Sequence, residues 1–176
     1  MKKRFYTTFS ILFLWAAFVV SSLALAQVKS IQAVFLYNIL HYFQWPNSVD
    51  PKIYNVCMVG KPDLLEPLKK IKNKSKDHDH TLNLYVYKNV EDAQQNRNCN
   101  LVYFDKSVKV NADDLKPFYQ RSVLTVGSQN RFSKIGMVEL AAQGGNLRLI
   151  INMRNVNKSQ LSISSRLLRV ATVVDE

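Results

Sequence analysis

Apolar residues along this chain fall into short blocks of strand length, and the segments between the blocks have helical spacing. The block from Thr81 to Tyr87 alternates apolar and polar side chains, as a strand with one buried face does. The link from Gln143 to Asn146 contains two glycines, which permit the positive φ angles of a tight hairpin turn. The predicted strands are Ile53–Val59, Thr81–Tyr87, Leu101–Phe104, Val123–Val126, Met137–Ala142 and Leu147–Met153.

The first predicted helix, Ile31–Gln44, has apolar residues nearly all round its surface. Ser30 is its expected N-cap, and Trp45-Pro46 is its expected end, because a proline disfavours helix in the residue before it. Two interpretations of the broad apolar surface stay open. One is burial within the domain or a dimer, and the other is contact with a partner protein through Tyr37, His41 and Trp45.

Further helices are predicted where polar capping residues precede apolar residues at helical spacing. They begin after Asp63, at Asp113-Asp114 and at Ser164-Ser165, the last with Leu167, Leu168, Ala171 and Val174 on one side. The polar connection from Asn89 to Asn98 is a further candidate helix. A short helical turn is expected between Val126 and Met137. Strands that alternate with helices and then end in an antiparallel hairpin predict an α/β fold. We expect a single domain with a mixed, mostly parallel β-sheet of about six strands, a C-terminal hairpin and helices on both faces.

The first 26 residues have the three parts of a secretory signal peptide. Met1 to Arg4 is basic, Phe9 to Val20 is apolar but short for a membrane span, and Ala24-Leu25-Ala26 matches the A-x-A cleavage pattern. An uncleaved anchor helix is the alternative. We expect cleavage near Ala26, export to the periplasm and a mature domain over residues 27–176.

The chain is strongly basic, with a formal net charge of +11. Removal of residues 1–26 leaves 21 basic and 13 acidic side chains, a charge of +8. Export argues against nucleic acid as the partner. The positive charge then either binds an acidic protein or an envelope polymer, or only keeps the surface soluble. The oxidising periplasm also predicts one disulfide between Cys57 and Cys99, with a switchable thiol pair as the alternative.

Candidate metal ligands occur in one short segment. His78 and His80 have the i, i+2 spacing that places both on one face of a strand, next to Asp77 and Asp79. His41 is the only further histidine that could complete such a site, and nearby lysines oppose cation binding. A solvated loop is therefore the simpler interpretation.

No motif of a catalytic acid, base or nucleophile is present in the chain, and we predict no catalytic residue, metal or cofactor. Asp63 and Asp105, just beyond two strand ends, are a candidate carboxylate pair that caps and loop solvation explain more simply. Arg166 and Arg169 are three residues apart on the last predicted helix. They form a candidate edge for binding carboxylates of a partner, with ordinary surface arginines as the alternative.

An ordered set of segments resembles the YfiR family of bacterial periplasmic proteins over essentially the whole mature chain. The segments are Ala33–Asn38, Phe43–Pro46, Val56–Gly60, Cys99–Phe104, Val123–Val126, Gly136–Val138, Leu147–Asn152 and Leu161–Ala171. The resemblance implies a mixed β-sheet flanked by helices. Cys57 and Cys99 match one cysteine pair of the family, but the second pair, near Ile135 to Ala142, has no counterpart here.

The resemblance also implies a regulator without catalysis. Well-known members restrain a membrane-bound diguanylate cyclase by binding its periplasmic sensory domain, and an OmpA-like outer-membrane lipoprotein withdraws them, so that cyclic di-GMP and biofilm formation rise. Members are dimeric and redox-sensitive through disulfides. Two other classes of function stay open for this chain: a periplasmic small-ligand or metal-binding accessory of a transport or sensory system, and an enzyme.

Overall fold

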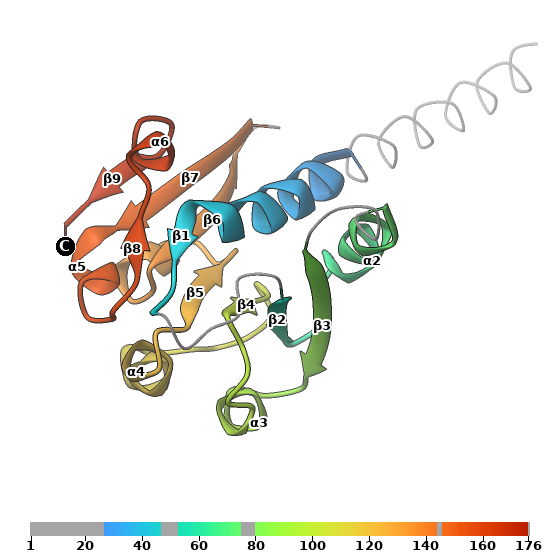
Figure 1. Cartoon of the computed structure of the whole chain (residues 1–176), viewed down its shortest axis with the longest axis horizontal. Helices are drawn as coiled ribbons and strands as arrows, with labels where there is room; N and C mark the ends of the chain where they lie inside the picture. Colours follow the sequence, from blue (N-terminus) through green and yellow to red (C-terminus); the bar gives the residue numbers. More distant parts are fainter. Residues whose placement is uncertain (1–26, 47–52, 75–79, 144–145, 176) are drawn as a thin grey trace, which may run out of the picture.

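The computed structural model describes residues 27–46, 53–74, 80–143 and 146–175. Its main feature is a seven-stranded sheet in the order β3-β2-β4-β5-β6-β7-β9 (Figure 1). The strands are β2 (Ile53–Val59), β3 (Thr81–Tyr87), β4 (Leu101–Phe104), β5 (Leu124–Gly127), β6 (Val138–Gln143), β7 (Asn146–Asn152) and β9 (Thr172–Val174). The predicted segment of residues 1–26 and the turn at Gly144-Gly145 lie outside the described residues.

The sheet is mixed and mostly parallel, as predicted. Strands β2 to β6 pair in parallel, β6 and β7 form the antiparallel hairpin, and β9 lies parallel to β7. The α/β fold class is therefore confirmed. The sheet has one strand more than the six that the apolar blocks predict, because β9 is added at the edge.

Helices cover both faces of the sheet (Figure 1). The helix of residues 27–39 and α2 (Leu65–Lys74) lie on one face, where Val56 and Met58 are buried. The helices α3 (Val90–Gln95) and α4 (Ala112–Gln120) lie on the other face, which buries Cys57. Strands β2, β4 and β5 are buried on both sides, which explains their nearly unbroken apolar sequence.

Side-chain caps start the helices of the second face. Asn111 accepts hydrogen bonds from the backbone N–H groups of Asp113 and Asp114, and the Asp114 carboxylate accepts one from the Asn111 N–H. Asn89 caps α3 through the Asp92 N–H. Each cap satisfies donors that the first helical turn leaves unpaired, so these starts are set locally.

The first helix differs from its prediction at both ends. Residues 27–30 are already helical, so Ser30 is not the N-cap, and the helix ends at residue 39. A 3-10 turn, η1 (Leu40–Tyr42), and a short strand, β1 (Phe43–Gln44), follow. Strand β1 pairs with β8 (Ser162–Ile163) in a second, two-stranded antiparallel sheet. Long-range backbone hydrogen bonds thus replace the helical ones that the local pattern predicts.

The C-terminal region also differs from its prediction. Strand β7 ends at Asn152, and Met153 begins a short helix, α5 (Met153–Val156), that the sequence pattern did not indicate. Ser164 does cap the last helix, but that helix, α6 (Ser165–Leu168), is only one turn long. Val174 therefore lies in β9 and not on a helix face shared with Leu167.

Candidate functional site

The β1–β8 pairing joins the two segments that carry the predicted partner-binding residues. Phe43 lies opposite Ile163, and the Ser164 N–H donates a hydrogen bond of 2.8 Å to the Tyr42 carbonyl. The segment of the first helix and the segment of α6 are far apart in sequence, yet this ladder makes them neighbours (Figure 1). We use the name ladder surface for the five predicted contact residues that come before or after these two strands in the sequence: Tyr37, His41, Trp45, Arg166 and Arg169.

On the first segment, the side chains form a cluster of rings around Tyr54 of β2. The His41 ring lies 5.1 Å from that of Tyr37 and 5.4 Å from that of Tyr54, both edge-on. Trp45 lies 6.0 Å from Tyr54, and His80 stacks on Tyr54 at 5.4 Å. Tyr54 is buried, Tyr37 and Trp45 are half-buried, and His41 is exposed. Mutual packing holds these rings, so they present a defined edge to solvent.

A metal site is the alternative use of these histidines. The rings of His41 and His80 lie 5.0 Å apart, but His78, Asp77 and Asp79 fall outside the described residues. Within the part of the chain that is described, no three metal-ligating side chains come together. The described geometry therefore supplies two of the ligands that a metal needs and no third.

The packing of His41 leads to a prediction on pH. Burial, and then the charge of His80, lower the pKa of His41 from 6.5, so the folded state favours the neutral ring. Below pH 6.5, His41 binds a proton more readily in the unfolded chain than in the folded one. The contribution of the neutral His41 ring to the free energy of unfolding is therefore present above pH 6.5 and is lost as the pH falls.

We expect denaturant titrations at about pH 7.5 and about pH 5.5 to show a smaller pH-dependent loss of stability for His41→Gln than for the unmodified protein. The effect is modest, because His41 is largely exposed. Equal losses in both proteins would contradict it.

On the second segment, both arginines of the ladder surface are exposed. The Arg166 N–H donates to the capping Ser164 hydroxyl at 3.3 Å, and Arg169 is the C-cap of α6. Val170 follows with 73% of its surface exposed. An exposed valine beside two exposed arginines is a surface with both apolar and cationic contacts to offer. Among the described residues, neither guanidinium forms an ion pair.

Exposed apolar residues also occur on the first helix. Ala33, Leu36 and Ile39 are buried, whereas Ile31, Val34 and Phe35 are exposed. The domain therefore covers only one side of a helix that is apolar nearly all round. The exposed side of this helix is available either to a dimer contact or to a partner contact.

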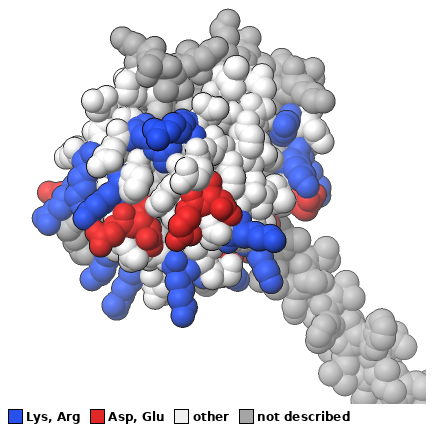
Figure 2. Space-filling model, turned by 90° about the horizontal axis from the view of Figure 1, so that it is seen from below, with Lys and Arg blue, Asp and Glu red and all other residues white. Residues whose placement is uncertain are grey.

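The net positive charge does not form one continuous patch on the α3–α4 side. Figure 2 views this side and shows Lys and Arg side chains surrounding groups of Asp and Glu. Glu91 and Asp92 in the first turn of α3, and Asp113 and Asp114 in that of α4, are acidic residues of these helices. Mixed charge of this kind is typical of a soluble surface rather than of a nucleic-acid interface.

The candidate carboxylate pair does not form a reactive site. Asp105 is buried, and its Oδ1 accepts hydrogen bonds from the Ser107 N–H at 2.9 Å and the Ser107 hydroxyl at 2.6 Å. Asp63 instead forms an ion pair of 2.5 Å with Lys29. Each carboxylate thus has a structural partner, which is Ser107 of its own loop for Asp105 and the distant Lys29, in place of a helix cap, for Asp63.

The carboxyl ends of the parallel strands, where open α/β sheets commonly bind ligands, are closed by loops. Gln129 Nε2 donates to the carbonyls of Asp105 and Val108, each at 3.0 Å. Gly60, at φ +97°, lies so close to Val108 that a Cβ atom would clash with it. The chain is therefore tightly packed at this edge of the sheet beside Gly60.

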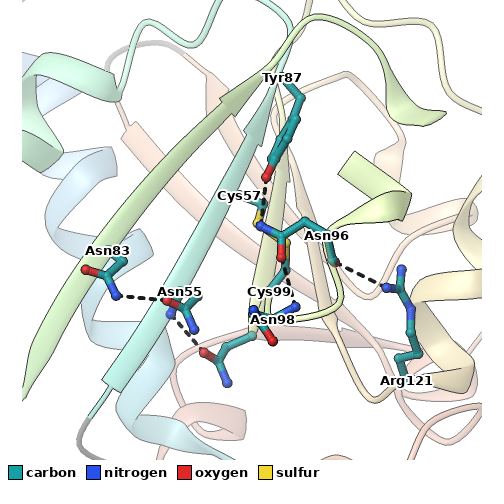
Figure 3. Close-up of a disulfide and its surroundings, with 9 residues drawn as sticks. Asn55, Cys57, Asn83, Tyr87, Asn96, Asn98, Cys99 and Arg121 are labelled. Carbon is teal, nitrogen blue, oxygen red and sulfur yellow. Dashed lines mark hydrogen bonds between the residues drawn. A yellow bond between two sulfur atoms is a disulfide. The ribbon is translucent and has the colours of Figure 1, made fainter. Parts of the chain in front are cut away.

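Cys57 and Cys99 form a disulfide, as predicted. Their Cα atoms lie 5.8 Å apart, and the bond links β2 to the residue two positions before β4. Asn96 lies beside the bond, where its Nδ2 donates to the Tyr87 hydroxyl at 2.7 Å and lies 3.6 Å from Cys57 Sγ (Figure 3). The disulfide thereby fixes the loop that leads from α3 into β4.

A cavity of about 490 Å³ opens beside this disulfide. It lies at the amino ends of β2, β4 and β5, the opposite edge from the usual ligand site. Its lining includes Trp45 of the ladder surface and Cys99 of the disulfide, together with residues that the sequence did not single out. These are Ile53, Asn55, Asn83, Tyr85, Arg97, Asn98, Asn100, Arg121 and Ser122.

The sequence carried only a faint indication of this cavity. Asn55 and Asn83 are polar positions inside two otherwise largely apolar strands. The parallel register places them directly opposite each other, but nothing in the sequence specifies that register. Arg97 and Arg121 come from separate loops, and only the chain fold makes them neighbours.

Comparison with known protein families shows which family this chain matches. A family model described as YfiR/HmsC-like matches residues 29–172. No curated protein matches the chain. In the described residues, no helix combines the length and apolar character that crossing a membrane requires.

Proposed function

Because this chain belongs to the YfiR/HmsC-like family, we propose that it is a non-catalytic periplasmic regulator that binds and restrains a membrane-bound signalling protein. The family match over residues 29–172 is the observation that carries the proposal. A diguanylate cyclase is the first partner to test, since restraint of such an enzyme lowers cyclic di-GMP and with it biofilm formation.

Restraint of this kind needs no chemistry in the regulator. Binding energy selects the inactive conformation of the partner, so the regulator must bind that conformation more tightly than the active one. The ladder surface is suited to such binding. It combines a fixed aromatic edge at Tyr37 and Trp45 with the exposed arginines of α6, and aromatic and arginine side chains are the types that contribute most at protein interfaces.

We further propose where the domain acts and what releases the cyclase from it. The signal peptide of residues 1–26 delivers the domain to the periplasm, where it acts as a homodimer. An OmpA-like outer-membrane lipoprotein that competes for the domain would free the cyclase.

Charge reversal on α6 tests the ladder surface. We expect Arg166→Glu with Arg169→Glu to weaken co-purification with the inner-membrane partner by about tenfold or more, because like charges then face its carboxylates. Cellular cyclic di-GMP should rise towards the level of a deletion strain.

The matched control is Lys109→Glu with Lys116→Glu, which makes the same change of charge at exposed positions before and on α4, away from the ladder surface. It should leave both readouts unchanged. If deletion of the whole protein leaves cyclic di-GMP unchanged, the cyclase as partner is excluded. If both double variants act alike, the ladder surface is excluded as the contact.

The cavity beside the disulfide favours a second candidate function, a ligand-binding accessory of a transport or sensory system. The two functions predict different results with purified protein. A regulator that acts only through protein contacts gives no heat with small ligands, whereas an accessory binds them without any partner.

A further inference from the structure

Two side-chain amides that line the cavity beside the disulfide use their oxygen atoms as acceptors within the protein. Asn100 Oδ1 accepts the Asn55 N–H at 2.8 Å, and a backbone N–H can meet only the oxygen of that amide, so Asn100 Nδ2 is left as a free donor. Asn55 Oδ1 accepts Asn83 Nδ2 at 3.0 Å, which leaves Asn55 Nδ2 free as well (Figure 3). Both amides therefore offer N–H groups to a ligand.

Arg121 adds a positive charge that forms no ion pair within the described residues. Its Nη1 donates to the Asn96 carbonyl at 3.2 Å (Figure 3). Its Nε donates to the Pro117 carbonyl at 3.0 Å, and the guanidinium lies 5.5 Å from the centre of the Phe118 ring. These contacts hold the side chain in place. The third nitrogen, Nη2, is buried and has no acceptor among the described residues.

Arg97 brings a second guanidinium to the same cavity. Burial, and then the charge of Arg97, lower the pKa of Arg121, which means that the two cations oppose each other. No carboxylate is among the described residues that line the cavity, and neither arginine has an ion-pair partner in that part of the chain. Two like charges at one cavity, without a carboxylate in the described part of its lining, favour an anion.

The rest of the lining is less polar. Ile53 and the rings of Trp45 and Tyr85 form part of the wall, and Trp45 Nε1 is a buried donor without an acceptor in the described residues. The volume of about 490 Å³ lies within the usual range for small-molecule sites. Apolar rings beside a cationic, donor-rich end are suited to a ligand with an apolar body and an anionic head.

We propose that this cavity binds a small organic anion, with its carboxylate or phosphate at Arg97 and Arg121 and its apolar body against Trp45, Ile53 and Tyr85. Asn55 and Asn100 donate hydrogen bonds to the anionic group. The site rests on the second candidate function, ligand binding, and shares Trp45 with the ladder surface, whereas restraint of a partner plays no part in it. Because Cys99 is part of the wall, an intact disulfide keeps the site in shape.

Isothermal titration calorimetry on the oxidised mature protein tests the site with three probes: benzoate, phenyl phosphate and inorganic phosphate. We expect one equivalent of benzoate or phenyl phosphate to bind, and the preferred head group distinguishes a carboxylate site from a phosphate site. Inorganic phosphate should bind more weakly than phenyl phosphate, because it has no body to contact the rings. If none of the probes binds, the proposal is wrong.

Two variants connect binding to the arginines. Arg97 is exposed and makes no hydrogen bond in the described structure, so Arg97→Gln should fold normally and weaken binding by about tenfold. Arg121→Gln should weaken binding at least as much, and its thermal unfolding checks whether the contacts to Pro117 and Asn96 were needed for folding.

The chemically matched control is Arg166→Gln, which removes one positive charge on α6, just as each cavity variant removes one at the cavity. It should bind the probes as the unmodified protein does. An equal loss in the control and in Arg97→Gln would overturn the proposal, since binding would then depend only on net charge.

Discussion

Replacing both Cys57 and Cys99 by alanine is expected to lower the free energy of unfolding by about 4 kcal/mol. The bond closes a loop between residues 42 positions apart, and the chain-entropy model assigns a value of this size to such a loop. The Cα separation of 5.8 Å lies in the usual range for disulfides. Alanine is preferred to serine, because both sulfurs are buried and a hydroxyl there would need a hydrogen-bond partner.

Thermal unfolding measures this effect. For a domain of this size, a loss of about 4 kcal/mol lowers Tm by roughly 8–16 °C. A reducing agent should lower the Tm of the unmodified protein by a similar amount and leave the double alanine variant unchanged. If reduction has no effect on the unmodified protein, the disulfide is not a staple. Reversible loss of partner binding on reduction would instead favour the switchable pair.

Phe104→Ala is expected to lower the free energy of unfolding by about 3–5 kcal/mol. Phe104 is fully buried at the end of β4, where its ring lies 5.9 Å from that of Phe118 in α4 and 5.7 Å from that of Phe132. Phe132 belongs to the short turn η3 (Phe132–Lys134), so one ring connects three elements. Removing it leaves a cavity that the surrounding backbone cannot close.

Urea titration followed by far-UV circular dichroism measures this loss. The midpoint should fall while the m-value stays constant, because the native and unfolded surfaces change little. Val170→Ala is the control, since Val170 is 73% exposed and its truncation should change stability by no more than about 0.5 kcal/mol. Similar losses in the two variants would mean that Phe104 is not packed as described.

Local patterns in the sequence were sufficient to predict most of the fold. Six strands of the main sheet are visible in the sequence. Those buried on both sides, β2, β4 and β5, appear as nearly unbroken apolar runs, and the edge strand β3 appears as an alternating one. The helix at Asp113-Asp114 was predicted because its caps lie within one turn of it. The pairing of Cys57 with Cys99 followed from having only two cysteines in an exported chain.

Elements that depend on distant partners were the ones that the sequence did not predict correctly. Phe43-Gln44 continues a helical pattern, and it becomes a strand only because Ser162-Ile163 pairs with it. Thr172–Val174 is too short to show a period of its own, and it becomes β9 because the edge of β7 offers it hydrogen bonds. In both cases the free energy comes from a ladder between segments that are remote in sequence.

The sequence by itself determined the α/β class, the order of most elements, the disulfide partners and the resemblance to a family. The tertiary structure alone decided which side chains meet. It paired the strand that follows His41 with the strand that precedes Arg166, and it collected Asn55, Arg97 and Arg121 at one cavity. Apolar periodicity records whether a residue is buried, which is a local property, whereas a site depends on strand register and chain crossings, which arise only when the whole chain packs.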